Sequence, residues 1–345
     1  MTNIVLNSKM WIPISELDIS ELIWLKDKLT IVPKICKAYD PNAKTEPIYL
    51  YNVHEGLFGI PRAFGYTRYL LSDVRKNDMN VSDYRTDERG TIEFRSDIVL
   101  WEEQEQPVSD VLSGLLEGSN GGLLQSACGS GKTVMALKVV AELGAPTLII
   151  LHDEGLLGQW KKDTKKFLNL KDSEIGHVQG PRCDYIGKKI VFAVTQSLHA
   201  RRKSYPIGLY SYPTLVIYDE VHRAGSRTFC TWMDKVRAKF RFGLSATPRR
   251  WDGAENIFKW HIGEVFAIGK ANNMAPKIFQ IFLPKLCPDL QRANGTWLIP
   301  TMISMLSGSK TPKGKTKAIV SPNVGSIRRV AYMTRDIVQA LQKGR

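Results

Sequence analysis

Several features are scarce in this sequence of 345 residues. It has only five cysteines, and no two of them are spaced like a pair of metal ligands. No apolar run approaches the roughly 18–20 residues of a membrane-spanning helix, and the first residues lack the basic flank and apolar stretch of a signal peptide. These absences exclude a disulfide scaffold, and they predict a cytoplasmic protein with reduced thiols and no membrane partner.

Acidic residues are nearly absent from residues 265–345. Thirteen Lys or Arg stand there against only Asp289 and Asp336, and the whole chain has a formal net charge of +14. A basic excess favours a polyanionic partner, because binding to phosphates releases condensed counterions. A solvated basic surface would have the same composition, so charge alone supports a nucleic-acid partner without establishing one.

Composition divides the chain into three regions without an internal repeat. Residues 1–95 contain short apolar runs broken by Gly, Pro and Asn, which indicates a small α+β domain with a hairpin near residues 54–56. Residues 96–264 alternate helical stretches with the apolar runs GGLLQSA, PTLIILH, KIVFAVT and PTLVIYDE. That alternation predicts an α/β fold, a parallel sheet covered on both faces. Residues 265–345 are basic and turn-rich, then helical.

The strongest local signal is SACGSGKT, residues 126–133, which follows an apolar strand and precedes a helical run. That context is typical of a phosphate-binding P-loop, although Ser126 stands where the common pattern has its first glycine. Gly129 and Gly131 allow backbone N–H groups to face phosphates at a helix N-terminus. Lys132 is expected to reach the β- and γ-phosphates, and Thr133 to ligate Mg²⁺. The predicted nucleotide-binding residues of the loop are Cys128, Gly129, Ser130, Gly131, Lys132 and Thr133.

The sequence LVIYDEVH, residues 215–222, supplies the acidic partner of this loop. Four apolar residues predict a strand, and Asp219 and Glu220 follow at its carboxyl end, where open α/β sheets bind ligands. Asp219 is expected to hold Mg²⁺, and Glu220 to orient and deprotonate the attacking water. We therefore predict an ATP and Mg²⁺ site with catalytic residues Lys132, Asp219 and Glu220, in which the lysine faces the acidic pair across neighbouring strands.

Five ordered motifs resemble those of superfamily 2 helicases. DEVH after the G-S-G-K-T loop resembles the second signature motif, and GLSATPRRWDG resembles the third, with the extension of the XPB-like and phage UvsW-like branch. LIILHDEGLLGQW resembles motif Ia, with His152 and Asp153 in place of Pro-Thr. FAVTQSL resembles an element that lies against the nucleic-acid backbone. LWEEQEQPV resembles the segment with an adenine-reading glutamine, here Gln104, although Glu103 replaces the usual aromatic residue.

The resemblance also covers the start of the chain. MWIPISEL, PIYLYN and GIPRAFGY are similar to the accessory domain that precedes the motor in phage and archaeal relatives of this branch. It implies a DNA-binding accessory domain at 1–95, a RecA-like ATP-binding domain at 96–264 and the start of a second RecA-like domain at 265–345. The implied function is an ATP-dependent DNA helicase or translocase acting on branched or duplex DNA, by branch migration or fork remodelling, in the host cytoplasm if the gene is a phage's.

Roles for further residues follow from the same resemblance. His222, Ser245 and Thr247 are implied to couple the ATP site to the DNA. Thr195, Gln196 and Arg223 are candidate contacts to nucleic-acid phosphates, although surface Arg and polar loop residues are more often merely solvated. Gln104 is the implied adenine-reading residue. Trp160 and Phe167, on one face of a predicted helix, are expected to be core residues.

One part of a superfamily 2 motor is missing from this sequence. No Gln-x-x-Gly-Arg-x-x-Arg string occurs, and an arginine finger contributes about 10³–10⁵ in rate. Residues 265–345 are fewer than the roughly 150 of a typical domain. We expect a truncated chain that binds ATP and hydrolyses it poorly. Two alternatives stay open: an ATP-gated DNA-binding module without motor activity, and the motor subunit of a restriction system, for which residues 1–95 show no Asp…Glu-x-Lys cluster.

Overall fold

The structure is a computed structural model that describes residues 2–34, 46–71, 79–201, 204–224, 232–250 and 252–269. The chain divides into two compact units, Met1–Asn273 and Met274–Arg345, and all the described residues belong to the first. The predicted start of a second RecA-like domain at 265–345 therefore lies outside the described residues, except for residues 265–269.

The N-terminal segment, residues 1–95, forms a five-stranded sheet in the order β5-β6-β2-β1-β7. Its β1–β7 pair is parallel and the other pairs are antiparallel. The strands are β1 (Thr2–Leu6), β2 (Met10–Pro13), β5 (Asn52–His54), β6 (Leu57–Ile60) and β7 (Met79–Asp83). The remaining elements are a 3₁₀ turn (Ile14–Glu16), α1 (Ile19–Lys28), the short strands β3 (Thr30–Ile31) and β4 (Ile48–Tyr49), α2 (Arg62–Gly65) and a π-helical turn (Tyr66–Leu70).

The predicted hairpin near residues 54–56 is confirmed. β5 pairs with β6 through His54 and Leu57, and only Glu55 and Gly56 lie between them. Both turn residues have positive φ, 47° and 75°. A two-residue turn with positive φ at both positions has the backbone twist that flanking antiparallel strands require.

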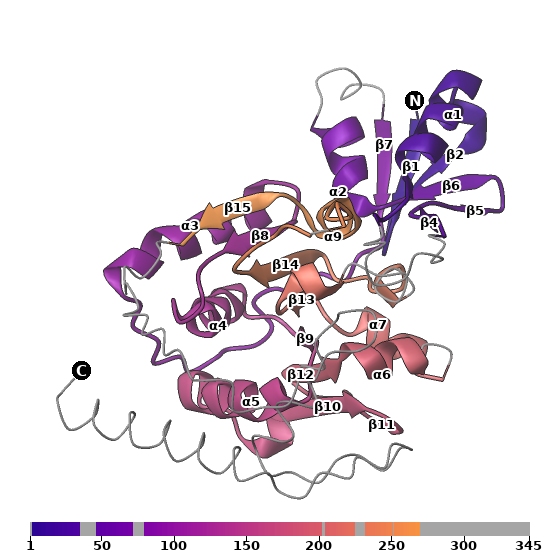
Figure 1. The fold of residues 1–345 in the computed structure, drawn as a ribbon. Coiled ribbons are helices and arrows are strands. Elements are labelled where there is room, and N and C mark those ends of the chain that lie inside the picture. Colours follow the sequence, from indigo (N-terminus) through magenta and orange to yellow (C-terminus); the bar gives the residue numbers. More distant parts are fainter. Residues whose placement is uncertain are drawn as a thin grey trace, which may run out of the picture. The chain divides into compact units, whose positions relative to one another are not determined.

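Residues 121–268 build an eight-stranded sheet in the order β11-β10-β12-β9-β13-β14-β8-β15 (Figure 1). All neighbours are parallel except the edge pair β10–β11. The four strands expected from apolar runs are confirmed, as is the α/β class. The strands are β8 (Gly121–Gln125), β9 (Thr147–Leu151), β10 (Ile175–Gln179), β11 (Arg182–Asp184), β12 (Ile190–Val194), β13 (Leu215–Tyr218), β14 (Phe240–Ser245) and β15 (Val265–Ile268).

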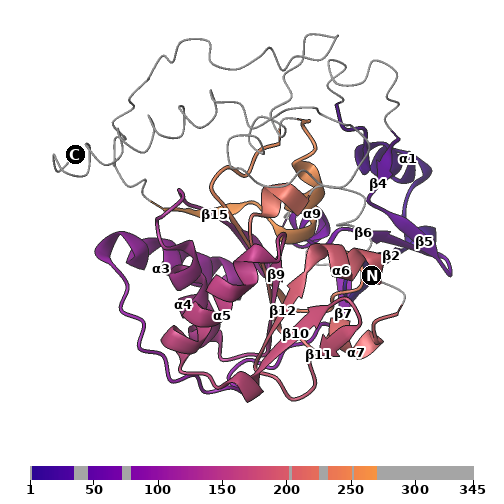
Figure 2. The same cartoon turned by 60° about the horizontal axis from the view of Figure 1, so that its bottom comes forward.

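Both faces of this sheet are covered, as expected for buried parallel strands. Ile149 and Leu151 of β9 belong to a core with α3, α4 and α5, whereas Leu148 and Ile150 belong to a second core with α6, α7 and α9. Figure 2 shows α3, α4 and α5 together on one side of the strands and α6 and α7 on the other. The helices are α3 (Glu102–Glu117), α4 (Lys132–Leu143), α5 (Gly155–Leu168), α6 (Thr195–Ala200), α7 (Ile207–Ser211) and α9 (Asn256–Ile262), with 3₁₀ turns at Asp172–Glu174 and Val221–Ala224. None of the helices described is both long and apolar enough to cross a membrane.

The strand order corrects one prediction. We expected the lysine loop and the acidic pair to follow neighbouring strands, but β14 lies between β8 and β13 and pairs with both. Strand order depends on pairing between distant segments, which a local apolar pattern does not specify. Because the three strands are parallel, their carboxyl ends still meet at one edge of the sheet. The first residues after Glu264 belong to the same sheet, because β15 pairs with β8 at its edge.

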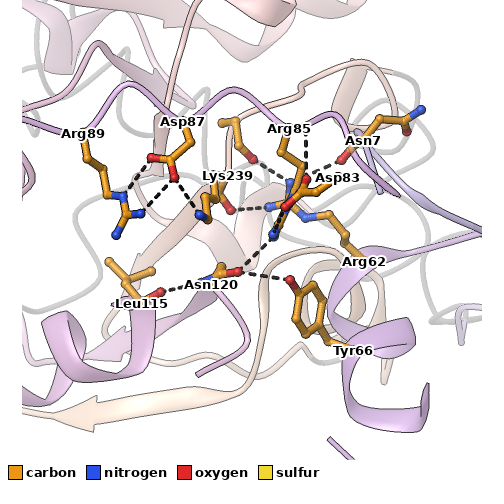
Figure 3. A network of polar contacts seen from close by, with 11 residues as sticks. Asn7, Arg62, Tyr66, Asp83, Arg85, Asp87, Arg89, Leu115, Asn120 and Lys239 are labelled. Carbon is orange, nitrogen blue, oxygen red and sulfur yellow. Dashed lines mark hydrogen bonds and ion pairs between the residues drawn. The ribbon is translucent and has the colours of Figure 1, made fainter. Parts of the chain in front are cut away.

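Polar contacts join the N-terminal segment to the large sheet (Figure 3). The buried guanidinium of Arg62 donates to Ala238 O (2.6 Å) and Lys239 O (2.9 Å) just before β14. Asn120, the residue before β8, accepts hydrogen bonds from Tyr66 Oη and Arg85 NH1 at its Oδ1. The contacts therefore reach the amino ends of β14 and β8, and the opposite ends of these strands lead to the candidate site.

Candidate active site

The loop after β8 has the backbone shape of an anion cradle. Gly129 and Gly131 have φ values of 79° and 82°, in the left-handed region that favours glycine. Ser126, in place of the usual first glycine, donates its hydroxyl to Ser130 Oγ (2.6 Å), and Ser130 Oγ donates to Ala127 O (2.7 Å). The two serines thus brace the loop from inside. α4 begins directly after the loop and has no side-chain cap, so its first N–H groups are available to an anion.

Lys132 points into the curve of this loop. Its Nζ donates to Ser126 O (3.0 Å) and Ala127 O (3.1 Å). Thr133 follows it, half-buried in the first turn of α4, while Cys128 and Gly129 are exposed at the top of the loop. A phosphate bound by the loop N–H groups would meet the ammonium group and the threonine hydroxyl together.

The acidic pair follows β13 at the same edge of the sheet. Asp219 Oδ2 accepts a hydrogen bond from Trp160 Nε1 (2.9 Å), and Oδ1 accepts one from Glu220 N (3.0 Å). Burial raises the pKa of Asp219, and the indole hydrogen bond and the positive charge of Lys132 oppose that shift. Lys132 is therefore close enough to act on this carboxylate electrostatically. The Trp160 contact was not predicted, because sequence analysis assigned this residue to the core alone.

Glu220 has an unusual backbone conformation. Its φ is 48°, in the left-handed region, which is uncommon for a residue with a side chain and concentrates at functional sites. The conformation folds its N–H back onto Asp219, and its Oε2 lies 3.4 Å from His222 Nδ1. The two carboxylates thus have separate partners, which suits different roles.

The predicted coupling residues lie together. His222 Nδ1 is 2.9 Å from Ser245 Oγ, at the end of β14, and Ser245 Oγ also accepts a hydrogen bond from Thr247 N (3.1 Å). The Thr247 side chain itself is exposed. Arg250 NH1 donates to His222 O (2.9 Å). Burial lowers the pKa of His222; the Glu220 carboxylate opposes this shift and neighbouring positive groups reinforce it, so the net direction favours a neutral imidazole.

The candidate nucleic-acid contacts converge on the end of β9. Thr195 Oγ1 donates to Leu151 O (3.1 Å), Gln196 Nε2 donates to His152 O (2.8 Å), and Arg223 NH1 lies 3.1 Å from His152 Nε2. A cavity of about 540 Å³ is lined by these side chains and by the acidic pair; its polar lining residues include His152, Thr195, Gln196, His199, Asp219, Glu220 and Arg223. Sequence analysis missed His152, and its departure from Pro-Thr in motif Ia was the available signal.

Gln104 lies against the P-loop rather than in open space. Its buried side chain donates from Nε2 to Ser130 O (2.9 Å) and accepts at Oε1 from Trp101 N (3.1 Å). A β-carbon on Gly131 would lie 2.4 Å from Gln104 Nε2. The Gln104 amide has a second N–H and a second lone pair that these two contacts do not use. Both could still contact an adenine, so the adenine-reading role stays a prediction.

The donor set suits magnesium with a nucleotide. In the described ranges, no group of three or more His, Cys, Asp or Glu side chains is arranged to hold a metal ion. Mg²⁺ is usually held by one or two carboxylates together with substrate phosphates and water, rather than by an all-protein cage. Asp219 and the Thr133 hydroxyl, with phosphates in the loop, fit that pattern.

Residues 97–250, which hold nearly all of this site, match the family described as "Type III restriction enzyme, res subunit". A putative ATP-dependent RNA helicase of Acanthamoeba polyphaga mimivirus is 30% identical over 243 residues, 70% of this chain and 44% of that protein. The DNA 3'-5' helicase XPB of Mycobacterium tuberculosis is 31% identical over 151 residues, 43% of this chain and 26% of that protein. Residues 97–250 thus form a helicase domain of this family, with XPB-like and viral helicases among its relatives.

The fold of the chain resembles that of a phage protein. The crystal structure of the UvsW helicase from bacteriophage T4 superposes with a TM-score of 0.54 and 17% identity, over 77% of this chain and 99% of that one. A probable helicase of Escherichia phage T5 is 30% identical over 159 residues, 45% of this chain and 33% of that protein. The chain spans less than half the length of each of these three sequence relatives.

Proposed function

We propose that the chain is the ATP-binding part of a motor that acts on branched or duplex DNA. The observation that carries the proposal is the convergence of Lys132 with Asp219 and Glu220 at one edge of the sheet, beside the cavity lined by Thr195 and Arg223. A phosphate site and a hydrogen-bonding cavity that share the same carboxylates can be linked energetically.

The ATP site would work through its own side chains. The loop N–H groups and Lys132 hold the phosphates, and Thr133 and Asp219 hold Mg²⁺. When bound, Mg²⁺ would neutralise charge on the β- and γ-phosphate oxygens. Glu220 orients the attacking water and accepts its proton. Gln104, held at the loop, reads the adenine edge with its remaining amide N–H and lone pair.

Coupling to DNA would run through His222 and Ser245. Glu220 Oε2 lies 3.4 Å from His222 Nδ1, which in turn contacts Ser245 Oγ. When phosphate release changes the hydrogen bonding of Glu220, His222 Nδ1 can exchange its contact with Glu220 Oε2 for the contact with Ser245 Oγ. Thr195, Gln196 and Arg223, near the same acidic pair, contact the phosphates of the nucleic acid.

The choice of DNA over RNA rests on sequence motifs, because neither the named relatives nor the net charge decides it. The names of the M. tuberculosis and mimivirus relatives specify DNA and RNA respectively, so the relatives alone do not decide. The XPB-like and UvsW-like motifs favour DNA, and with them a role in branch migration or fork remodelling. The formal charge of +14 suits either polymer. We further propose that residues 1–95 contact DNA and that a second RecA-like domain begins after β15, which itself belongs to the large sheet.

Hydrolysis by this chain is proposed to be slow. The sequence has no Gln-x-x-Gly-Arg-x-x-Arg string, and an arginine finger accounts for about 10³–10⁵ of the rate in motors of this kind. We therefore expect the chain to bind ATP with Mg²⁺ and to turn it over slowly until an arginine is supplied by a second RecA-like domain.

The test measures ATP hydrolysis and analogue binding with single-stranded, duplex, forked and four-way DNA and with RNA. We expect four-way or forked DNA to stimulate hydrolysis most, and Lys132→Ala to abolish analogue binding. Equal effects of all polymers on the slow rate, or nucleotide binding that ignores Lys132→Ala, would contradict the proposed motor.

A second candidate is an ATP-gated DNA-binding module without motor activity, which the missing arginine-finger string favours. A salt titration of branched-DNA binding, with and without a nonhydrolysable ATP analogue, separates the two. If the chain is an ATP-gated DNA-binding module, the analogue should change the affinity for DNA, and DNA should not stimulate ATP hydrolysis. The alternative that the chain is the motor subunit of a restriction system predicts Mg²⁺-dependent DNA cleavage. Only the description of the matching family supports this alternative.

A further inference from the structure

We propose that Trp160 is a positioning residue of the ATP site, whose indole N–H fixes the orientation of the Asp219 carboxylate for binding Mg²⁺. The inference rests on the proposed function, because it assumes that Asp219 holds the metal ion. It gives a role in the chemistry to a residue 59 positions away in the sequence, on a helix that carries none of the nucleotide-site residues.

The geometry of the contact supports this role. Trp160 is 3% exposed, and its Nε1 lies 2.9 Å from Asp219 Oδ2. The other carboxylate oxygen, Oδ1, accepts the backbone N–H of Glu220 at 3.0 Å. Each oxygen of Asp219 therefore has a fixed donor, and the plane of the carboxylate is held from two sides. A carboxylate has about four lone-pair directions, so two of them remain for other ligands.

An indole is well suited to hold a metal-binding carboxylate. It is a donor only and stays protonated, so it cannot exchange roles with Asp219 or compete with the carboxylate for a cation. Its bicyclic ring is rigid and lies on the buried face of α5 with Thr164 and Leu168. α5 packs against α4, the helix that carries Lys132 and Thr133. The indole N–H therefore lies on a helix that packs directly against the helix following the phosphate loop.

Core packing accounts for only part of this arrangement. The helical periodicity of α5 explains why Trp160 is buried, and a buried indole N–H usually finds an acceptor. Packing alone does not require that the acceptor of the Trp160 N–H be the Asp219 carboxylate, which is the proposed Mg²⁺ ligand. The indole N–H donates directly to Asp219 Oδ2, and a hydrogen bond donated to a carboxylate stabilises its charged form. The contact thus favours the charged carboxylate, which is the form that binds a cation.

The experiment removes the N–H of Trp160 and keeps an aromatic side chain at this position. Trp160→Phe deletes the donor, and replacement of Trp160 by benzothienylalanine keeps the bicyclic shape and exchanges only N–H for sulfur. The matched control is Trp11→Phe, because Trp11 Nε1 makes an equally long hydrogen bond, 2.9 Å, to Asn7 Oδ1 in the N-terminal segment. Binding of a fluorescent nonhydrolysable ATP analogue is titrated with Mg²⁺ and is also measured in excess EDTA.

We expect both Trp160 replacements to raise the Mg²⁺ concentration for half-maximal binding by about tenfold or more, as is typical when the partner of a metal ligand is lost. Analogue affinity in EDTA should match that of the wild type, and Trp11→Phe should change neither value. An unchanged Mg²⁺ requirement in both Trp160 replacements would overturn the proposal. So would an equal loss of affinity with and without Mg²⁺, which is the signature of a packing role.

Two controls keep the result interpretable. Thermal unfolding shows whether Trp160→Phe is folded, and the benzothienyl replacement carries the test if it is not. Wild-type binding separates this inference from the proposed function. If the wild type binds the analogue without regard to Mg²⁺ or Lys132, the proposed ATP site fails. If the wild type depends on both and the Trp160 replacements behave like it, only the positioning role fails.

Discussion

His222 Nδ1 lies 2.9 Å from Ser245 Oγ, and this contact joins the segment after β13 to the end of β14. The backbone of the same serine reaches the other side of the site, because Ser245 O accepts a hydrogen bond from Ser126 N of the P-loop (3.0 Å). Ser245 is fully buried. One residue on the intervening strand therefore touches both halves of the candidate ATP site.

Ser245→Ala should weaken the coupling between nucleotide and DNA while leaving nucleotide binding intact. The alanine keeps the backbone bond to Ser126 and removes the hydroxyl that contacts His222. We expect the ratio of DNA affinities with and without a nonhydrolysable ATP analogue to fall by about 2- to 30-fold, which corresponds to coupling changes of roughly 0.5–2 kcal/mol. Fluorescence anisotropy of labelled forked DNA measures the ratio.

Ser211→Ala, at the end of α7, is the matched control for this prediction, since it removes a half-buried serine hydroxyl for which no contact to the site residues is found in the described part of the chain. An unaltered ratio in Ser245→Ala would remove this serine from the coupling path.

Gln104→Leu should affect both the P-loop and the choice of base. Leucine has a similar size and leaves Ser130 O and Trp101 N without their side-chain partner, which should lower the free energy of unfolding by about 1–3 kcal/mol. We also expect the preference for ATP over GTP analogues to fall. Urea unfolding and competition binding measure the two effects. A loss of affinity by one common factor for ATP and GTP would show that Gln104 braces the loop and does not read the base.

Much of the large sheet could be predicted from the sequence. Runs of four or five apolar residues, such as LVIY in β13 and IVFAV in β12, are buried at every position in the structure. Such runs, bounded by turn residues, indicate central parallel strands. The loop at residues 126–133 was equally clear in its place: it lies between β8 and α4 as expected, and its glycines Gly129 and Gly131 have positive φ.

The remaining features depend on contacts between distant residues. Helical periodicity predicted that Trp160 is buried, but it holds no information on the direction of the indole N–H. The position of β14 between β8 and β13 follows from strand pairing. Arg62 and Arg241 are fully buried even though arginine is mostly exposed. Their acceptors are backbone carbonyls, such as Ala238 O for Arg62 and Ser8 O for Arg241, which any sequence would supply.

Arg62→Met should destabilise the chain strongly. The guanidinium bridges Ala238 O, which is buried, and Lys239 O, which is partly buried, and methionine leaves both acceptors without that donor. We expect a loss of about 3 kcal/mol in the free energy of unfolding, since hydrogen bonds to charged groups contribute about 1.5–3 kcal/mol each. Arg62→Lys should not restore it, because one ammonium group does not reproduce the planar fork. Urea unfolding followed by tryptophan fluorescence measures the loss.

Arg89→Met is the control for this prediction, because Arg89 makes a largely exposed pair with Asp87 and such pairs contribute about 0–1 kcal/mol. Equal losses in Arg62→Met and Arg89→Met would contradict a special role for the buried arginine.

Asp87 should make the stability of the chain depend on acid pH. Burial alone would raise its pKa, but hydrogen bonds from Arg89 and Lys239 lower the pKa to about 2. An aspartate in the unfolded chain titrates near pH 4. The folded state therefore favours the charged form, and the stabilisation is complete above about pH 5 and is lost as the pH falls through about 2. Because the group is partly solvated, we expect about 1 kcal/mol.

Asp87→Asn tests this directly. The difference in free energy of unfolding between wild type and Asp87→Asn should be constant from pH 7 to 5, shrink below pH 4 and vanish only below pH 2. Asp97→Asn, at an exposed aspartate without a side-chain hydrogen bond or ion pair in the described part of the chain, should leave a pH-independent difference close to zero. A gap for Asp87→Asn that persists well below pH 2 would mean that the asparagine disturbs packing, because a fully protonated Asp87 can no longer form ion pairs with Arg89 and Lys239.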